Sequence, residues 1–565
     1  MISQFFKKQY PEGIDTEIDL SAYSSVLDVL DESCKHFADR PAFSNMGKTI
    51  SFKELDQHAR DFAAYLQNHL GLKAGERIAI QLPNTLQYPI ALFGAMRAGL
   101  IVVNTNPLYT EREMRHQFQD SGVKALVVLA NMAHLAEKVL PDTKIEHVIV
   151  TELGDMQGFA KRLLINAVVR YVKKMVPAFS LPKAVTFRSA LSIGQTLPLQ
   201  EHRAQPEDLA VLQYTGGTTG VAKGAMLSHR NLVANMLQAR IVIKTVMDEG
   251  TESIVLPLPM YHIYSFTVSL VLMELGNHSI LITNPRDLPA FVKELSKTRF
   301  TGFVGLNTLF VALANRDDFK QLDFSGLKLT ISGGMALTHA AEKEWHEVTG
   351  CHIYEGYGMT ETSPIATFNL PCKSQLGTIG FPVPSTDVKV VDEQGVTLPL
   401  GEVGELCVQG PQVMVGYWNK PEETAEMIDE QGWLNTGDMA VIQPDGYIRI
   451  VDRKKDMINV SGFNVYPNEV EDVIVSHPAI IEAAAIGVPD EKTGEAIKVF
   501  LVLRNHEISA QEVKDYCREH LTGYKVPKQI EFRKELPKTN VGKVLRRTLR
   551  DEELAKIKQE KVATV

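Results

Sequence analysis

A short run of glycines, threonines and one lysine at residues 214–224, YTGGTTGVAKG, has the composition of a phosphate-binding loop. Glycines such as Gly216, Gly217 and Gly220 let backbone N–H groups approach an anion closely. The threonine hydroxyls add further donors, and Lys223 adds positive charge. A flexible polar turn is the alternative, but such a turn would not need so many adjacent phosphate donors. The run therefore predicts a loop that holds phosphate.

The spacing of this loop differs from that of the two best-known nucleotide-binding loops. A Walker loop reads G-x-x-x-x-G-K-[ST], whereas Lys223 follows Ala222 and precedes Gly224, and the loop contains no G-x-G-x-x-G. A helix begins at the lysine of a Walker loop. Here KGAML reads as a strand, and the next helix begins later, with Ser228 as its cap. We therefore expect the loop to join two strands.

Most of the chain before about residue 430 alternates between helix-like and strand-like segments. Residues 51–70 have helical period, and residues 76–84 read as the strand that follows. Residues 124–130 and 147–152 are short apolar runs of the β type. This alternation predicts parallel sheets covered by helices.

From about residue 376 to residue 451, short strands alternate with Gly/Pro turns. This pattern predicts a small antiparallel barrel or sheet. Within it, MAVI and YIRIV flank QPDG, which predicts a hairpin turn. The charge cluster DRKKD at residues 452–456 marks a domain boundary.

The remaining residues of the chain predict a separate small α+β domain. Asn468 with Glu471, and Ser509 with Glu512, have the spacing of helix N-terminal boxes. The strand-like runs EAAAIGV and AIKVFLVL lie between these two predicted helices.

The composition is that of an ordinary globular protein, with 44% apolar and 22% charged residues. Its 565 residues predict about three to four domains or subdomains. The formal net charge of -9 argues against a nucleic-acid partner bound through general basicity. The five cysteines include no CxxC pair, so we expect a reducing compartment and a cytoplasmic protein.

We expect neither a secretory signal nor a membrane-spanning helix. The N-terminal residues MISQFFKKQYPEGI lack a long apolar core. The two most apolar stretches are interrupted by Arg97 and Glu274, so we expect both to form buried core.

The stretch GFAKRLLINAVVRYVKK, residues 158–174, carries five basic residues and no acid among largely apolar neighbours. A basic amphipathic helix can lie on an anionic membrane, which would place the protein peripherally on the inner face of the cell membrane. A surface helix packed on its own domain is the alternative. We favour this alternative here, because periodicity alone is weak evidence for a membrane contact.

Five motifs follow one another along nearly the whole chain. They are YTGGTTGVAKG at 214–224, YEGYGMTETSP at 354–364, GWLNTGD at 432–438, DRKKDMINVSGFNVYPNEVE at 452–471 and PKTNVGKVLRR at 537–547. In this order they resemble the adenylate-forming superfamily, which contains acyl-CoA synthetases, luciferases and the adenylation domains of peptide synthetases. The stretches ALFGAMRAGLIVVNTNPLYT, LPMYHIYSF, LITNPRDLP and LTGYKVPK are similar to its long-chain acyl-CoA synthetase branch in bacteria.

The resemblance implies an α/β fold with a large N-terminal domain at residues 1–452. This domain would contain two helix-covered α/β subdomains and a small β-barrel over about 376–451. A small, mobile α+β C-terminal domain at residues 453–565 would follow, with a hinge near Lys455. In this family the C-terminal domain rotates between the two steps of the reaction, and a segment near Gly462 enters to shape the CoA channel.

The activity implied by the resemblance is the ATP-dependent ligation of a long-chain fatty acid to coenzyme A, for β-oxidation and lipid metabolism. The carboxylate first attacks the α-phosphorus of ATP and gives acyl-AMP and pyrophosphate. The CoA thiol then attacks the acyl carbonyl, and AMP leaves. The first step brings anions together, so it needs cations and positioning more than a base.

The resemblance also assigns the phosphate side of the site. The loop would wrap the β- and γ-phosphates of ATP with Tyr214, Thr215, Gly216, Gly217, Thr218, Thr219, Gly220 and Lys223. Thr360 would face phosphate. Glu361 and Thr215 would hold Mg²⁺, an ion that prefers oxygen ligands.

On the nucleoside side, Tyr357 would stack on adenine. The adenine pocket would be lined by Gly334, Glu355 and Gly356. Asp438 would accept hydrogen bonds from both ribose hydroxyls, and Arg453 would approach the ribose from the other side.

The remaining assignments concern the reacting groups. Lys543 would place its charge over the carboxylate and the α-phosphate during adenylation. His262 and Phe266 would border the acyl tunnel, where many relatives have tryptophan in place of Phe266. Asn307 and Met335 replace the proline and alanine of many relatives, which leaves the acyl preference open.

Two other functions stay open. The first is a medium-chain or aryl-acid CoA ligase of the same superfamily. The second is a non-catalytic acyl or nucleotide sensor, against which Lys543, Glu361 and Asp438 argue. The oligomeric state is not determined by these motifs.

Overall fold

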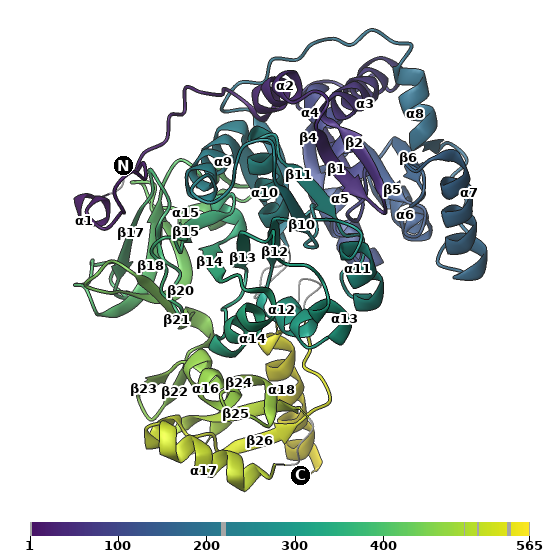
Figure 1. Cartoon of the computed structure of the whole chain (residues 1–565). Helices are drawn as coiled ribbons and strands as arrows, with labels where there is room; N and C mark the ends of the chain where they lie inside the picture. Colours follow the sequence, from purple (N-terminus) through teal and green to yellow (C-terminus); the bar gives the residue numbers. More distant parts are fainter. Residues whose placement is uncertain (1–2, 216–221, 491, 505–507, 539–543, 564–565) are drawn as a thin grey trace.

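The computed structural model describes residues 3–215, 222–490, 492–504, 508–538 and 544–563 of the chain (Figure 1). The strands among these residues form four sheets. Three sheets are built from residues up to Arg453, and the fourth is built from residues after it.

The first sheet has eight strands. In spatial order they are β19 (Gly416–Tyr417), β9 (Lys223–Ser228), β8 (Leu209–Thr215), β4 (Ile101–Asn104), β3 (Arg77–Gln81), β5 (Ala125–Leu129), β6 (His147–Thr151) and β7 (Val185–Thr186). Neighbours from β8 to β7 pair in parallel, whereas β9 and β19 add antiparallel strands. The helices between these strands in the chain include α4 (Gln87–Arg97), α5 (Glu111–Ser121), α6 (Ala133–Val139) and α8 (Phe187–Gly194).

The second sheet has nine strands. In spatial order they are β16 (Phe381–Pro382), β15 (Ile365–Phe368), β14 (Ile353–Gly358), β13 (Leu329–Gly333), β12 (Gly302–Gly305), β10 (Ser253–Leu256), β11 (His278–Leu281), β1 (Pro41–Asn45) and β2 (Lys48–Ser51). Neighbours from β14 to β1 are parallel, as predicted from the alternating pattern. The helices of this part include α9 (His229–Ile243), α10 (Ile263–Glu274), α11 (Leu288–Leu295), α12 (Asn307–Ala314) and α14 (His339–Thr349).

One hydrophobic core joins the two sheets. Val211 of β8 and Leu256 of β10 belong to the same cluster of buried side chains, together with most of α9 and α10. The apolar stretches interrupted by Arg97 and Glu274 form α4 and α10, and both helices are buried, as predicted. Within the described ranges, no helix is long and apolar enough to cross a membrane.

The third sheet is antiparallel and covers the segment predicted as a small barrel or sheet. Its strands are β17 (Asp387–Val391), β18 (Val403–Gln409), β20 (Leu434–Ile442) and β21 (Ile448–Arg453). Among the described residues, β17 and β21 at the two ends of this order are not paired with each other. A hairpin turn at the QPDG sequence joins β20 to β21, as predicted. Val390 and Leu406 of this sheet pack into the core of the two larger sheets.

The fourth sheet belongs to the C-terminal α+β part, drawn from green to yellow in Figure 1. Its strands are β22 (Ile458–Val460), β23 (Phe463–Val465), β24 (Ile480–Asp490), β25 (Gly494–Leu503) and β26 (Gln529–Phe532), and its helices include α16 (Pro467–Val475), α17 (Ala510–His520) and α18 (Arg546–Ala563). Its buried side chains form two clusters of their own, separate from the main core. The domain boundary after residue 452 and the hinge near Lys455 stay predictions.

Local signals explain where most of the predicted helices begin. Ser228 caps α9 and Ser509 caps α17, each through a reciprocal capping box. The helix predicted over residues 51–70 starts at Phe52, after a third such box, and continues as a π-helical turn to His69.

The predicted box of Asn468 and Glu471 is wrong. Helix α16 begins at Pro467, whose fixed φ suits the first helical position, and no side chain caps it. The Glu471 carboxylate instead accepts hydrogen bonds from the Arg546 side chain and from the backbone N–H of Ala485. A long-range ion pair therefore takes the place of the expected local contact.

Candidate active site

The phosphate loop lies between two antiparallel strands, as the misfit with a Walker loop predicted. Thr215 at the end of β8 pairs with Lys223 at the start of β9. Tyr214 is buried, and its hydroxyl donates to the Asp120 carboxylate. A side chain at Gly224 would approach the Tyr214 ring to 3.0 Å, so glycine allows this close packing. The other predicted loop residues lie outside the described ranges: Gly216, Gly217, Thr218, Thr219 and Gly220.

Three predicted nucleoside-binding residues lie together: Tyr357 near the end of β14, Asp438 within β20 and Arg453 at the end of β21. The Tyr357 hydroxyl donates a hydrogen bond of 2.6 Å to Asp438 Oδ2. Arg453 Nε lies 3.6 Å from Asp438 Oδ1, because the two residues are register partners in β20 and β21. Burial and the Asp438 carboxylate raise the pKa of Tyr357 well above its usual value, so this hydroxyl stays a donor.

Glu361 forms a second carboxylate–tyrosine pair. It lies in the 3-10 turn η4 (Thr360–Thr362) with only 6% of its surface exposed, and the Tyr417 hydroxyl donates to its Oε1 at 2.6 Å. Burial raises the pKa of Glu361, while the Tyr417 hydrogen bond and the charges of Lys223 and Arg453 oppose this increase. Thr360, the other predicted residue of this turn, is half-buried.

Tyr417 is a site residue that the sequence motifs missed. It lies in β19, which pairs with β9 beside the phosphate loop, and Lys223 Nζ lies 5.0 Å from the centre of its ring. The sequence GYW around it matches none of the five motifs. Only the pairing of β19 with β9 brings it to Glu361, so no local signal could have assigned it.

The edge of the second sheet next to Tyr357 is built from glycines. Gly333 at the end of β13 pairs with Gly356 of β14, and Gly334 follows with a φ of +84°. A side chain at Gly356 would meet the Phe368 ring at 2.8 Å. Ligands of parallel sheets bind beyond the carboxyl ends of the strands, where these glycines leave the backbone accessible.

Glu355, predicted for the adenine pocket, is buried and accepts a hydrogen bond of 3.2 Å from the backbone N–H of Leu337. Burial raises the pKa of Glu355 to about 8. Burial therefore favours the protonated carboxyl, which can donate one hydrogen bond while it accepts another. It lines a cavity of about 250 Å³ together with Leu337, His352 and Thr378.

The predicted acyl residues lie at the start of α10. His262 is the N-cap residue, and its Nδ1 accepts from the backbone N–H of Tyr264. Phe266 is fully buried in the core. Of the two departures from related sequences, Asn307 accepts two hydrogen bonds from Thr338, and Met335 packs on the main core.

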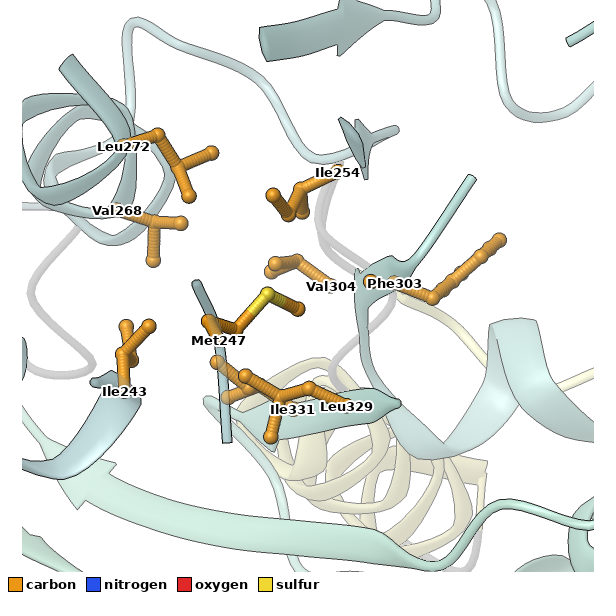
Figure 2. A pocket seen from close by; sticks show the side chains of 10 residues that line it. Ile243, Met247, Ile254, Val268, Leu272, Phe303, Val304, Leu329 and Ile331 are labelled. Carbon is orange, nitrogen blue, oxygen red and sulfur yellow. The ribbon is translucent and has the colours of Figure 1, made fainter. Parts of the chain in front are cut away.

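A small apolar cavity lies under α9 and α10, against β10, β12 and β13 (Figure 2). Figure 2 shows Met247 pointing into it between the two helices and the sheet. Its volume is about 10 Å³, which is room for about one water molecule and not for an acyl chain. Ile331, which lines this cavity, is two residues before Gly333 in β13. A side chain at Gly333 would meet the Tyr264 ring at 3.2 Å. The Tyr264 hydroxyl also donates to the Ile331 backbone oxygen at 3.4 Å, so Tyr264 contacts both a strand that lines the cavity and the glycine edge.

The predicted residues of the C-terminal part are less closely gathered. Lys455 follows Arg453 by two residues, and burial lowers its pKa. Gly462 lies in the exposed turn between β22 and β23, where its N–H donates to Asn459 Oδ1. Lys543 lies outside the described ranges.

Comparison with known proteins identifies the class to which this fold and site belong. Residues 30–418 match the family model described as AMP-binding enzyme, and residues 469–543 match that described as AMP-binding enzyme C-terminal domain. The chain belongs to the AMP-binding enzyme family. The predicted resemblance to adenylate-forming enzymes is therefore confirmed.

The relatives narrow this class further. The chain is 53% identical to "Long-chain-fatty-acid--CoA ligase" of Haemophilus influenzae, over 97% of this chain and 98% of the relative. It is 52% identical to the protein of the same name from Escherichia coli O6:H1, with the same coverage. Among solved structures, the anthranilate CoA ligase AuaEII in complex with anthranoyl-AMP superposes with a TM-score of 0.85 at 25% identity, over 96% of this chain and 100% of that one.

Proposed function

We propose that this enzyme ligates long-chain fatty acids to coenzyme A through an acyl-adenylate, consuming ATP and releasing AMP and pyrophosphate. The observation that carries the proposal is the Tyr357–Asp438–Arg453 arrangement beside the glycine edge of the sheet. The relatives named as long-chain ligases, at 52–53% identity over nearly the whole chain, support the choice of substrate.

In this proposal Asp438 and Glu355 bind different parts of the nucleotide. Asp438 accepts the ribose hydroxyls, and Arg453 keeps its charge compensated. The protonated carboxyl of Glu355 donates to the adenine edge, and Tyr357 covers the base. These contacts fix the α-phosphorus relative to the attacking carboxylate, which is the larger part of catalysis between two anions.

The residues proposed to lie near the ATP phosphates are suited to hold a magnesium ion. Glu361 is a buried carboxylate with one oxygen bonded to Tyr417, and hard oxygen ligands are what Mg²⁺ prefers. We propose that Glu361 and Thr215 hold the ion, which neutralises phosphate charge when bound. Thr360, Lys223 and the rest of the phosphate loop would hold the leaving pyrophosphate.

Lys543 would act on the other side of the α-phosphate. We propose that its ammonium group stabilises the charge that develops during adenylation and that the C-terminal domain then turns about Lys455. This rotation would bring the turn at Gly462 towards the acyl-adenylate for CoA attack.

We place the acyl chain beside α10, with its carboxylate near His262 and Tyr264. The apolar cavity behind Tyr264 would widen to receive the chain, since Met247 and the surrounding aliphatic side chains can change rotamer. Each buried methylene contributes about 0.8 kcal/mol, so a long tunnel binds tightly but distinguishes neighbouring chain lengths weakly. Because long-chain acids partition into membranes, the proposal includes a peripheral contact with an anionic membrane.

Pyrophosphate release measured with octanoate, palmitate, oleate and benzoate tests the substrate class. We expect the highest kcat/KM with palmitate or oleate. A preference for octanoate or benzoate would favour the medium-chain or aryl alternative, and no release with any acid would favour a sensor.

The Lys543→Ala variant tests the division into two steps. We expect it to lose adenylation while it still transfers acyl groups from supplied acyl-AMP to CoA. The matched control is Lys534→Ala, which removes a lysine of the same domain outside the five motifs. Wild-type adenylation in Lys543→Ala would contradict the assigned role.

A further inference from the structure

The basic, apolar segment at residues 158–174 forms a helix that exposes its apolar side chains. Helix α7 (Phe159–Ala167) continues as the π-helical turn η3 (Val168–Val172), and no residue of this α7–η3 helix is buried. It lies at the outer edge of the molecule, beyond α6 (Figure 1). Of the 15 exposed large apolar residues in the described part of the chain, six occur in this helix or just after it: Phe159, Leu163, Leu164, Tyr171, Val172 and Met175.

Two polar side chains of this helix, Asn166 and Arg170, attach it to the protein. The Asn166 side chain accepts from the backbone N–H of Gly154 at 2.8 Å and donates to Asp155 at 3.2 Å. The Arg170 guanidinium donates to Glu152 Oε1 at 2.6 and 3.1 Å. Asn166 and Arg170 are four residues apart, so they define one face of the helix, which is attached by polar contacts.

Another part of the helix surface is apolar and exposed. Leu163, Leu164 and Tyr171 recur at the spacing of one helical face, with exposed fractions of 52%, 64% and 73%. Single exposed apolar residues are normal on protein surfaces, but a contiguous group marks an interaction site. The α7–η3 helix thus presents large apolar side chains to solvent, where a surface helix usually presents polar ones.

The segment that carries this face is basic in sequence. Residues 156–200 contain seven Lys and Arg residues and no Asp or Glu, although the whole chain has a net charge of -9. Lys173 and Lys174 are exposed directly beyond Tyr171 and Val172. The Arg162 guanidinium lies 5.4 Å from the centre of the Phe159 ring, at the other end of the helix.

We propose that the α7–η3 helix docks in the surface of an anionic lipid bilayer, with its exposed apolar face inserted and Lys173 and Lys174 on the headgroups. A helix with an apolar face, a basic border and too few residues to span a bilayer lies in the interface plane. The inference rests on the proposed function, because a bilayer is where a long-chain acid partitions. A second copy of this chain is a poorer occupant, since a two-fold contact would bring the same positive charges together.

The test is co-sedimentation of the full-length protein with vesicles of phosphatidylcholine, alone or mixed with phosphatidylglycerol. We expect wild-type protein to bind the anionic vesicles more tightly. Lys173→Gln/Lys174→Gln should weaken this binding about 30-fold, and Leu164→Ser/Tyr171→Ser about 100-fold.

Two control pairs match these changes elsewhere on the surface. Val396→Ser/Leu400→Ser removes apolar side chains that are 60% and 46% exposed, and Lys35→Gln/Lys343→Gln removes lysines that are 74% and 75% exposed. Both control proteins should bind vesicles as wild type does. Pyrophosphate release with detergent-dispersed oleate should be unchanged in all four variants, so a failure of the proposed function is seen separately.

Three outcomes would overturn the inference. One is wild-type protein that binds neither kind of vesicle, and another is an unchanged affinity in both α7–η3 variants. The third is a dimer in sedimentation velocity that Leu164→Ser/Tyr171→Ser abolishes, which would make a second copy the occupant. Far-UV circular dichroism of each variant checks the fold, which these exposed side chains should not alter.

Discussion

Two carboxylate–tyrosine pairs stand at the same site and differ in what surrounds them. Asp438 and Tyr357 form one pair and Glu361 and Tyr417 the other, each through a hydrogen bond of 2.6 Å. Asp438 lies on a strand of the antiparallel sheet and has Arg453 within 3.6 Å. Glu361 lies in a short turn, and no described Lys or Arg side chain lies within 4.0 Å of it.

This difference supports the separate roles that we propose for the two acids. The charge of Asp438 is compensated by Arg453, so the carboxylate can accept hydroxyl groups without attracting a further cation. The charge of Glu361 is buried and only weakly compensated, which makes the ionised form costly until a cation binds. The same hydrogen-bonded pair therefore suits a ribose in one position and a metal ion in the other.

The Glu361→Gln variant should have the largest effect. The amide keeps the shape and one acceptor oxygen but removes the negative charge that would hold Mg²⁺. We expect kcat for pyrophosphate release to fall by about 10²–10³-fold, with a higher Mg²⁺ concentration needed for half-maximal rate. Glu402→Gln, at an exposed turn, is the control. An unchanged Mg²⁺ dependence would remove the proposed metal role.

The Asp438→Asn variant should have the second largest effect, and it should affect ATP binding more than turnover. Loss of a charged acceptor for two hydroxyls predicts an increase of about 10–100-fold in the KM for ATP. Wild type should discriminate against 2′-deoxy-ATP, whereas the variant should treat both nucleotides nearly alike. Equal discrimination in the two proteins would show that Asp438 does not bind the ribose.

The Tyr417→Phe variant tests the second pair through its pH dependence. The Tyr417 hydrogen bond lowers the pKa of Glu361, which burial raises, so its loss should raise this pKa further. In the proposed role Glu361 acts as a carboxylate, so the acidic limb of the rate profile should move to higher pH. We expect about a tenfold loss at about pH 6 and a smaller loss at about pH 8. A uniform loss at all pH values would point to a packing defect.

The motifs located both members of the first pair and only one member of the second. Asp438, Tyr357 and Glu361 were predicted because each lies in a short sequence pattern, and the loop between β8 and β9 was predicted from its misfit with a Walker loop. Tyr417 was missed because it reaches Glu361 only through the pairing of β19 with β9. Strand pairing between distant segments leaves no periodic signal in either one.

The same limit explains the misassigned helix start and the α7–η3 helix. Asn468 and Glu471 have the spacing of a capping box, but Arg546, far along the chain, binds both side chains. The composition of residues 158–174 predicted an amphipathic helix correctly. It could not show which face turns outward, since that depends on the contacts of Asn166 and Arg170 with Asp155 and Glu152.

The Tyr357→Phe variant should have the smallest effect, because Arg453 still holds Asp438 when the hydroxyl is removed. We expect an increase of about 2–10-fold in the KM for ATP and little change in kcat. A double-mutant cycle sharpens the comparison between the two pairs. Tyr357→Phe should be strongly non-additive with Asp438→Asn, its hydrogen-bond partner, and additive with Tyr417→Phe in the other pair. Strong coupling between the two tyrosine variants would mean that the pairs act as one unit and that ribose and metal binding are not separate.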